Sequence, residues 1–319
     1  MMKLSVFLLM LLMETCSAST YQNVALRGKA TQAGRYQFGF ASNAIDGNRD
    51  NKFLSGSCSH TDTERDPWWR VDLREPYIVT SIIISNRGDS YPERLQGAQV
   101  HIGNSLDNDG SSNPVVGTIS TIMAFYTMNF PDRVEGRYVS VHIPGEGKFL
   151  TLCEVEVYGY RAPTEENLAL QGKATQSSLF WYYIANYAID GSRHSKFNYS
   201  VNQVSCSVTA NELDPWWRLT LLKTHKVFSV KITNRFEYPA RINGAEIRIG
   251  DSLGNNGADN PRFAVITSIP AGETAEFEVA DGMDGHYVYI GIPGRKEYLT
   301  LCEVEVFGSA LDSQICYNV

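Results

Sequence analysis

Two arginines, a histidine and an aspartate are spaced so that together they could bind a small polar ligand. Twenty-six residues separate His60 from Arg87, and Asp89 follows two positions later. Four more residues separate Asp89 from Arg94. Residues two apart on an extended segment share a face, and each guanidinium supplies a rigid fork of donors. With His60 as donor or acceptor and Asp89 holding an arginine in place, the group suits a neutral sugar with cis or axial hydroxyls.

Two other interpretations of these residues stay open at this point. A surface ion-pair cluster uses the same side chains, and the spacing alone favours it. Arg87-Gly88-Asp89 also spells a tripeptide associated with integrin binding. Because the tripeptide directly follows a β-type run, a projecting loop tip is not assured, and we interpret it as a coincidence.

The chain contains one unit of about 145 residues twice. Three segments recur almost unchanged: "NVALRGKATQ" (23–32) with "NLALQGKATQ" (167–176), "DPWWR" (66–70 and 214–218) and "LTLCEVEV" (150–157 and 299–306). A duplication is an internal control, because shared residues are expected to form the scaffold and differing residues are candidates for a site.

The second copy departs from the charged cluster. Val208 takes the place of the histidine, and Glu237 stands near the place of the aspartate. The stretch from Arg235 to Arg241 is one residue shorter than its counterpart. Losing one of three polar contacts costs roughly 1–3 kcal/mol. We therefore expect this copy to bind the first copy's ligand weakly, to bind another glycan, or to be structural.

Residues 1–18 have the pattern of a secretory signal peptide. Lys3 precedes an apolar run, Leu4–Met13, that is too short to span a bilayer. We expect a secreted, extracellular protein without membrane insertion; a retained N-terminal anchor is the alternative. The net charge of −7 is spread along the 319 residues, and no basic stripe is present for a nucleic-acid partner.

Short β-type runs between turn residues predict an all-β fold. Several alternate apolar and polar residues: Tyr77–Ser85, Ala98–Gly103, Arg137–Ile143 and Cys153–Gly159. Many short strands in such a unit are typical of an antiparallel β-sandwich or jelly roll. The predicted division is a first domain at 19–160, a linker at 161–166, a second domain at 167–309 and a tail at 310–319.

Four cysteines occupy equivalent places in the two copies. In an oxidising compartment this predicts one disulfide per domain, Cys58–Cys153 and Cys206–Cys302. Each would close a loop of about 95 residues, which is worth roughly 4–5 kcal/mol in the chain-entropy model. No C-x-x-C spacing supports a metal site formed by cysteines.

Other sequence features are less informative. Cys316 is left over, either as a free thiol or for an intermolecular bridge, and Asn198 begins a glycosylation sequon. Common catalytic signatures are missing from the sequence. A glycosidase would need a pair of carboxylates that cannot be identified. We therefore predict no enzymatic activity.

The spacing of the charged cluster resembles the sugar-binding motif of F-type lectins, which are fucose-binding lectins. Further segments resemble that family in order: "NAIDGN" (43–48), "GSCSHT" (56–61), "DPWWRVDL" (66–73), "SNRGD" (85–89), "ERL" (93–95) and "LTLCEVEVYG" (150–159). The resemblance covers both copies. It reverses the preference for a surface ion-pair cluster.

The resemblance implies a discoidin-like, galactose-binding type of β-jelly roll. It also implies that His60, Arg87 and Arg94 bond the axial 4-hydroxyl, the 3-hydroxyl and the ring oxygen of L-fucose, with Asp89 supporting the arginines. For the C6 methyl group, Phe53 together with the next residue, Leu54, is our candidate wall, and a plain core phenylalanine is the alternative.

The family also carries a structural calcium ion near the site, and calcium takes six to eight oxygen ligands. By position, the implied ligands in the first copy are Asn43, Asp46, Asn48, Ser57, Cys153 (through its carbonyl) and Glu154. In the second copy they are Tyr187 (through its carbonyl), Asp190, Ser192, Ser205, Cys302 and Glu303.

One departure from the family pattern concerns the positions after the motif aspartate. Many members have two adjacent cysteines there, which form a vicinal disulfide against the sugar. Here the residues are Ser90 and Tyr91. Tyr91 could offer its ring face to the apolar side of the sugar.

The sequence is thus interpreted as a secreted, tandem, calcium-containing lectin for terminal L-fucose on glycans. Agglutination of cells or microbes in innate immunity follows from the family. Two sites, or one site multiplied in a homo-oligomer, would raise avidity. The runner-up is a discoidin-like adhesion module that binds a membrane surface or a protein. It would need exposed loop tips, whereas Trp68 and Trp69 occur in both copies, which favours core packing.

Overall fold

The computed structural model describes residues 21–196 and 206–311. Several sequence predictions lie outside these described residues: the signal peptide at 1–18, the sequon at Asn198, the calcium ligand Ser205, and Cys316 in the tail.

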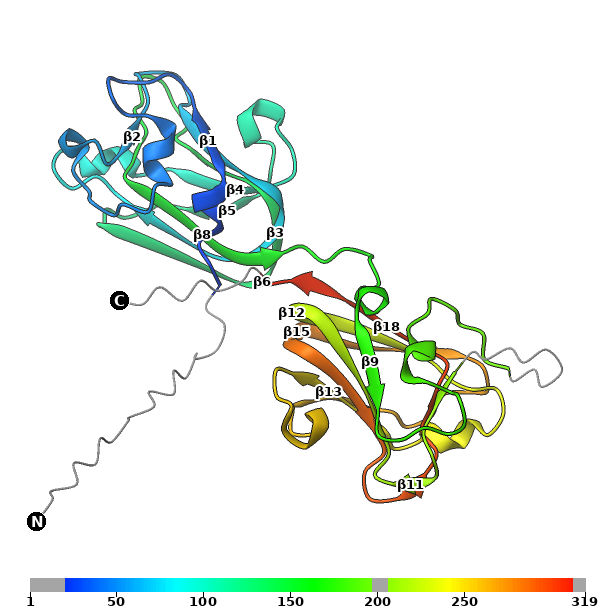
Figure 1. Ribbon diagram of the computed structural model, residues 1–319. Coiled ribbons are helices and arrows are strands. Elements are labelled where there is room, and N and C mark those ends of the chain that lie inside the picture. Colours follow the sequence, from blue (N-terminus) through cyan, green and yellow to red (C-terminus); the bar gives the residue numbers. More distant parts are fainter. Residues whose placement is uncertain (1–20, 197–205, 312–319) are drawn as a thin grey trace, which may run out of the picture. The chain divides into compact units, whose positions relative to one another are not determined.

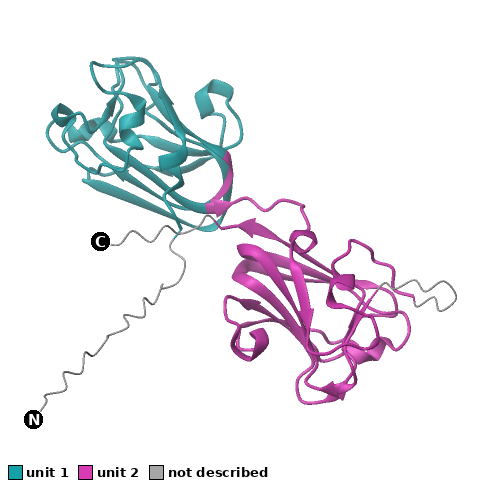
Figure 2. Cartoon of the chain, in the orientation of Figure 1, with its two compact units in different colours: residues 1–74, 79–159 teal, residues 75–78, 160–319 magenta. Residues whose placement is uncertain are grey.

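The chain forms two compact units (Figure 2). Unit 1 comprises residues 1–74 and 79–159, and unit 2 comprises residues 75–78 and 160–319. The boundary near Gly159 lies within β8 (Glu154–Arg161), the last strand of the first sequence copy. Each unit therefore contains one copy almost entirely.

Both units are built from antiparallel strands (Figure 1). The strands of unit 1 are β1 (Lys29–Gln32), β2 (Ser59–His60), β3 (Trp68–Ser85), β4 (Gln99–Gly103), β5 (Val115–Thr118), β6 (Phe125–His142), β7 (Thr151–Leu152) and β8 (Glu154–Arg161). Those of unit 2 are β9 (Lys173–Gln176), β10 (Ser207–Val208), β11 (Glu212–Leu213), β12 (Trp216–Thr233), β13 (Glu246–Gly250), β14 (Arg262–Val265), β15 (Thr274–Gly291), β16 (Lys296–Glu297), β17 (Thr300–Leu301) and β18 (Glu303–Ala310).

In the described part of the chain, the helical segments are single 3-10 turns. They are η1 (Val24–Arg27), η2 (Ala41–Ala44), η3 (Phe53–Ser55), η4 (Pro92–Leu95), η5 (Asp107–Gly110), η6 (Leu168–Gln171), η7 (Ala185–Ala188), η8 (Pro239–Ile242) and η9 (Gly254–Gly257). The prediction of an all-β fold is confirmed, and the predicted strand runs lie within or beside β3, β4, β6 and β8.

Two long strands organise each unit, β3 with β6 and β12 with β15. In unit 2, the first part of β12 pairs with β9 and its second part pairs with β18, while β15 runs beside both parts (Figure 1). The register shifts between Thr220 and His225, where β12 changes partner. One strand therefore serves both sides of the sandwich, and short loops at its ends can carry a site.

Alternating burial along the long strands creates the two cores. Trp69 and Trp217 are fully buried, and each indole N–H donates to a backbone carbonyl, of Ala41 and Ala185 respectively, at 3.0 Å. A buried indole is stable when its N–H is satisfied in this way. Trp69 and Trp217 are therefore core residues, as the repeated "DPWWR" segment predicted, whereas Trp68 and Trp216 are only partly buried.

Disulfides link the predicted pairs, Cys58–Cys153 in unit 1 and Cys206–Cys302 in unit 2. In unit 1 the bridge joins the segment before β2 to the start of β8. It therefore fixes the loop that leads to His60 against the last strand of the unit.

A single asparagine side chain fastens the beginning of each unit to its end. Oδ1 of Asn23 accepts from the backbone N–H of Ala25, at 3.1 Å, and of Val157, at 3.0 Å. Asn167 bonds in the same way to the N–H of Val306, at 3.0 Å. The first and last described segments of each unit are therefore adjacent.

Candidate functional site

The predicted cluster of unit 1 is assembled from three separate segments. His60 ends β2, Arg87 and Asp89 follow β3, and Arg94 lies in η4. Nε of Arg87 is 2.6 Å from Oδ1 of Asp89, and Nη1 of Arg94 is 3.4 Å from Nε2 of His60. The structure therefore brings together all four residues that the sequence spacing singled out.

His60 is a buried, neutral imidazole. Its side chain is 2% exposed, and Nδ1 lies 2.7 Å from the carbonyl oxygen of Thr61. Since a carbonyl only accepts, Nδ1 carries the proton and Nε2 is an acceptor. Burial lowers the pKa of His60; the bond to Thr61 opposes this, and the charges of Arg94 and Arg87 lower the pKa further. Nε2 of His60 can therefore accept a hydrogen bond from a hydroxyl at neutral pH.

Arg87 and Asp89 form a shielded ion pair beside His60. Arg87 is 8% exposed, and its guanidinium lies 4.8 Å from the ring centre of Phe53. Burial alone would raise the pKa of Asp89, but bonds from Arg87 and from the backbone N–H groups of Phe53 and Leu54 outweigh it, so the pKa is lowered. Asp89 thus stays charged and positions Arg87. A buried, paired arginine also agrees with our interpretation of Arg-Gly-Asp as a coincidence.

Arg94 is clamped between two aromatic rings. Its guanidinium carbon lies 4.2 Å from the ring centres of both Tyr91 and Phe149. Tyr91 has a positive φ of 54°, which is uncommon for a residue with a side chain. Such backbone strain, of the order of 1–3 kcal/mol, is typical of functional sites. The two rings hold the plane of the guanidinium in place, and the edge of the guanidinium remains for a ligand.

The sequence analysis missed the role of Phe149. The duplication contained a signal for it, because Phe149 and Tyr298 both precede the repeated "LTLCEVEV" segment. Tyr298 performs the same task in unit 2, where it lies 4.6 Å from the guanidinium of Arg241.

Phe53 is both a core residue and a wall of the cluster. It is buried beside the Cys58–Cys153 bridge. Its ring centre lies 5.0 Å from that of His60 and 4.7 Å from that of Phe38, on which it stacks. The neighbouring Leu54 is exposed.

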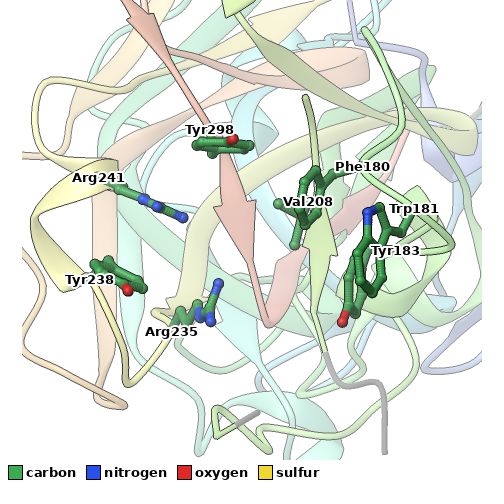
Figure 3. Close-up of a pocket in the computed structure, with 8 residues that line it drawn as sticks. All are labelled: Phe180, Trp181, Tyr183, Val208, Arg235, Tyr238, Arg241 and Tyr298. Atoms are coloured by element: carbon green, nitrogen blue, oxygen red, sulfur yellow. The ribbon is translucent and has the colours of Figure 1, made fainter. Parts of the chain in front are cut away.

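Unit 2 contains a cavity of about 290 Å³ at the equivalent place (Figure 3). It is lined by two arginines, a valine and several aromatic residues: Phe180, Trp181, Tyr183, Val208, Arg235, Tyr238, Arg241 and Tyr298. The two predicted arginines of this copy therefore meet in one pocket with the valine that replaces the histidine.

The arginines of unit 2 are held much as those of unit 1 are. Nε of Arg235 donates to Oε2 of Glu237 at 3.0 Å, so Glu237 pairs with Arg235 as Asp89 pairs with Arg87 in unit 1. Arg241 lies between the rings of Tyr238 and Tyr298. The φ of Tyr238 is 57°, close to that of Tyr91. The shorter connecting stretch therefore does not displace the second arginine.

Arg241 also faces an acidic residue. Its Nε lies 3.7 Å from Oε1 of Glu297. In unit 1, the group beside the corresponding arginine, Arg94, is the neutral imidazole of His60. A charged partner competes with a ligand for donors, so the unit 2 site differs electrostatically as well as in shape.

A buried carboxylate in each unit has the character of a cation ligand. Oε1 of Glu154 accepts from the N–H of Gly47 at 3.1 Å, while its Oε2 is buried with no hydrogen-bond partner among the described residues. Burial raises the pKa of Glu154 to about 7, and the charge of Asp46 adds to this. An orphaned buried oxygen of this kind is costly unless something binds it.

Glu303 repeats this arrangement in unit 2. Oε1 accepts from the N–H of Gly191 at 3.0 Å, Oε2 is unpartnered within the described residues, and burial raises the pKa to about 8. In the ranges that the structure describes, no group of three or more His, Cys, Asp and Glu side chains converges. The donors around these carboxylates would therefore be mainly carbonyl, hydroxyl and amide oxygens, which suit calcium.

The other predicted calcium ligands of unit 1 lie in or beside the loop that contains Gly47, the residue that donates to Glu154. Oδ1 of Asp46 accepts from the N–H of Asn48, whose Nδ2 lies 3.4 Å from Oγ of Ser57. Nδ2 of Asn43 donates to the carbonyl of Cys58 at 3.2 Å. In unit 2, Oδ1 of Asp190 accepts from the N–H of Ser192 in the same way.

Comparison with known proteins agrees with this geometry. Residues 43–141 and 187–290 match the family described as NedA-like, galactose-binding domain. The crystal structure of an F-lectin (fucolectin) from the serum of the striped bass, Morone saxatilis, is 64% identical to this chain. It covers 92% of this chain and 100% of its own, with a TM-score of 0.88. The chain belongs to the F-type lectin family.

Curated relatives of this F-type lectin match one domain's length. Fucolectin-3 of the eel Anguilla japonica is 49% identical over 143 residues, which are 43% of this chain and 78% of the relative. Fucolectin-6 of the same eel is 43% identical over 175 residues, 49% of this chain and 92% of the relative. These relatives are named lectins, so the prediction of a carbohydrate-binding protein rather than an enzyme is confirmed.

The comparisons also confirm the predicted discoidin-like fold and the tandem arrangement of this F-type lectin. Within the described residues, no helix is long and apolar enough to cross a bilayer.

Proposed function

We propose that this chain is a secreted lectin whose unit 1 binds terminal L-fucose on glycans. One observation carries the proposal. His60, Arg87, Asp89 and Arg94 form one cluster in a chain whose relatives are named fucolectins. Fucosylated glycans are the expected partners.

The polar groups of the cluster suit the oxygens of one pyranose ring. Nε2 of His60 accepts from a hydroxyl, and the two guanidinium groups donate to a second hydroxyl and to the ring oxygen. Asp89 holds Arg87 at 2.6 Å, and two rings hold Arg94, so both forks are oriented before the sugar arrives. Preorganised donors lose less entropy when they bind.

Apolar contact accounts for the methyl group of fucose. The ring of Phe53 lies beside both His60 and Arg87, so a sugar bonded to these residues would place its C6 methyl near an aromatic surface. The exposed Leu54 extends that wall, and the exposed ring of Tyr91 offers a further apolar face.

We further propose that each unit holds one structural calcium ion. The unpartnered oxygens of Glu154 and Glu303 support this proposal. In unit 1 the ion would be held by Asn43, Asp46, Asn48, Ser57, Cys153 through its carbonyl, and Glu154. In unit 2 it would be held by Tyr187, Asp190, Ser192, Cys302 and Glu303, with Ser205 outside the described residues. The ion would supply positive charge that ties the loop after η2 or η7 to the last strand.

Secretion, clustering of sites and a role in innate immunity complete the proposal. The striped bass relative comes from serum, which supports an extracellular location. Two units on one chain raise avidity for dense glycans without new contacts, and so would assembly into a homo-oligomer. Recognition or agglutination of microbes follows from such avidity. Unit 2 contributes an altered or weaker specificity.

Isothermal titration of L-fucose into the full chain tests the proposed function. Arg94→Ala removes the clamped fork and is expected to reduce binding by unit 1 at least about tenfold, equivalent to about 1.4 kcal/mol. Arg133→Ala is the matched control, because Arg133 is an exposed arginine paired with Glu135. Equal fucose affinity in the wild type and in a folded Arg94→Ala chain would remove the assignment.

The adhesion-module alternative is distinguished by binding of anionic vesicles. The tryptophans on which that alternative depended are not exposed loop tips, because Trp69 is buried and Trp68 is partly buried, although Trp181 of unit 2 is 72% exposed. We expect retention on immobilised fucose and none on vesicles.

A further inference from the structure

Two positions beside the site change together between the units. In unit 1, the N–H of His60 donates to the carbonyl of Gly39 at 3.1 Å. In unit 2, the N–H of Val208 donates to the carbonyl of Tyr183 at 3.2 Å. The backbone pairing is the same in both units, so Gly39 corresponds to Tyr183 as His60 corresponds to Val208.

Glycine is required behind the histidine. A Cβ atom at position 39 would lie 2.6 Å from Cβ of His60 and 2.7 Å from its backbone nitrogen. Such distances are far below an ordinary van der Waals contact. As the two segments are placed in unit 1, a side chain at position 39 would therefore overlap the backbone and Cβ of residue 60.

Aromatic rings fill the corresponding space in unit 2. In unit 1, the ring of His60 packs between Tyr36 and Phe149, with centroids 5.0 and 5.8 Å away. Their counterparts in unit 2, Phe180 and Tyr298, contact each other directly, edge to face, with centroids 5.4 Å apart. An apolar surface thus replaces the polar nitrogen.

The donors of unit 2 remain in the pocket. Arg235 and Arg241 project toward the space between Tyr298 and Val208 (Figure 3). Trp181, which is 72% exposed, lines the same pocket and stacks on Phe180 with centroids 5.8 Å apart. Aromatic walls with a few placed polar groups are the usual form of a small-ligand site.

We propose that unit 2 binds a saccharide and recognises the apolar face of the sugar ring, rather than the axial hydroxyl that His60 contacts in unit 1. Gly39–His60 in unit 1 and Tyr183–Val208 in unit 2 are the residue pairs that set this difference. The inference rests on the proposed function, because it takes L-fucose as the ligand of unit 1. Arg235 and Arg241 bind hydroxyls of the sugar, and Phe180 and Trp181 stack on its apolar face. Val208 makes no hydrogen bond to the axial hydroxyl.

Two sugars that differ at a single centre test the proposal: L-fucose and 6-deoxy-L-glucose, its C4 epimer. Titrations use the full chain with one unit silenced at a time. Arg241→Ala reports unit 1, which we expect to prefer L-fucose by at least about tenfold, or about 1.4 kcal/mol. Arg94→Ala reports unit 2, which we expect to bind both sugars within about threefold, or about 0.7 kcal/mol.

Exchange of the residue pair tests the role of Tyr183. In the Arg94→Ala background, Tyr183→Gly with Val208→His is expected to raise the preference for L-fucose to about tenfold. Val208→His alone is expected to leave the preference near that of its parent, because the tyrosine remains behind the introduced imidazole. A full shift from Val208→His alone would show that Tyr183 does not set selectivity.

The outcomes separate the two proposals. If the Arg241→Ala chain binds neither sugar, the proposed function is wrong. If unit 1 binds and discriminates while a folded unit 2 binds neither sugar, or discriminates equally, this inference is wrong and the proposed function stands. The selectivity of unit 2 in the Arg94→Ala chain decides the matter even if the exchanged variant does not fold.

Discussion

The two units share their framework and differ around the site in compensating pairs. The disulfide, the buried glutamate and the asparagine that joins the ends occur in both. At the site, one large and one small residue exchange places. Unit 1 has glycine behind a histidine, and unit 2 has tyrosine behind a valine.

A second exchange follows the same rule. The N–H of Gly88 donates to the carbonyl of Asn51 at 2.8 Å, and in unit 2 Phe236 bonds to Ser195 in the same way at 3.0 Å. A side chain at Gly88 would overlap the amide of Asn51. The comparison teaches that a site can diverge through linked substitutions while its scaffold stays fixed.

The shared framework predicts equal and large losses when either disulfide is removed. The bridges are 95 and 96 residues apart in sequence, and each should contribute about 4–5 kcal/mol in the chain-entropy model. Cys58→Ala with Cys153→Ala should destabilise unit 1, and Cys206→Ala with Cys302→Ala should destabilise unit 2 to a similar degree. Calorimetry of the full chain measures both transitions. A loss confined to one unit would break the equivalence.

Acid should distinguish the units through a histidine that only unit 1 has. His142 is buried beside His101, and Gly291 takes its place in unit 2. Burial, and then the charges of His101 and Arg70, lower the pKa of His142 from 6.5 to about 4. The unfolded chain therefore takes up this proton first, and unit 1 loses up to about 3 kcal/mol as the pH falls from about 6.5 to about 4.

His142→Gln should remove the contribution of His142 to the pH dependence of the melting temperature of unit 1, while His60, whose pKa burial also lowers, still contributes in the same direction. In the calcium-free chain Glu154 and Glu303 act in the opposite direction, because their raised pKa values favour the folded form as the pH falls. Because each unit has one of these glutamates, the measurement compares the melting temperature of unit 1 in the His142→Gln variant with that of unit 1 in the wild type. An unchanged slope would mean that His142 is not the group responsible.

Calcium removal should affect both units. An ion present at a hundred times its dissociation constant stabilises the folded state by about 2.7 kcal/mol. A chelator should lower both melting transitions, while Glu154→Gln should make only unit 1 insensitive and Glu303→Gln only unit 2. Two wild-type transitions that do not respond to chelation would contradict the calcium proposal.

The smallest effect sharpens the contrast at the site itself. His60→Ala removes one polar contact, worth roughly 1–3 kcal/mol, and should weaken L-fucose binding by unit 1 accordingly. Val208→Ala makes the matched change in unit 2, where no polar contact is lost, and should alter affinity by less than about 1 kcal/mol. Titration of each variant, with the other unit silenced, compares the two. Similar losses would show that Val208 contributes more than an apolar surface.

The sequence predicted the fold and the charged cluster because both depend on local patterns. Alternating runs such as Tyr77–Ser85 predict strands, and the duplication paired the cysteines by their equivalent positions. The cluster was recognised by spacing, since Arg87, Asp89 and Arg94 lie close together in the chain. His60 was grouped with them before the family resemblance was considered, and the resemblance then favoured a sugar site over a surface ion-pair cluster.

Other parts of the site depend on contacts between distant segments and were not predicted. Phe149 reaches Arg94 only because β7 returns beside β2. Gly39 resembles an ordinary turn residue in the sequence, and its constraint arises from pairing with His60 across the loop. The stretch before Arg241 is one residue shorter than its counterpart, yet Arg241 lies beside Tyr238 as Arg94 lies beside Tyr91, and both tyrosines have a left-handed backbone. Sterically coupled pairs of this kind become visible only when both backbones are placed.

The asparagine side chains that join the ends of each unit have a consequence for how such proteins grow. Asn23 touches the strand that closes unit 1, and Asn167 does the same in unit 2. The first and last described segments of each unit therefore lie next to each other. A further copy can be appended through a connector of a few residues, with no strand rethreaded and no core opened. The number of binding sites can thus increase by duplication of one unit, and each new unit can then acquire its own specificity.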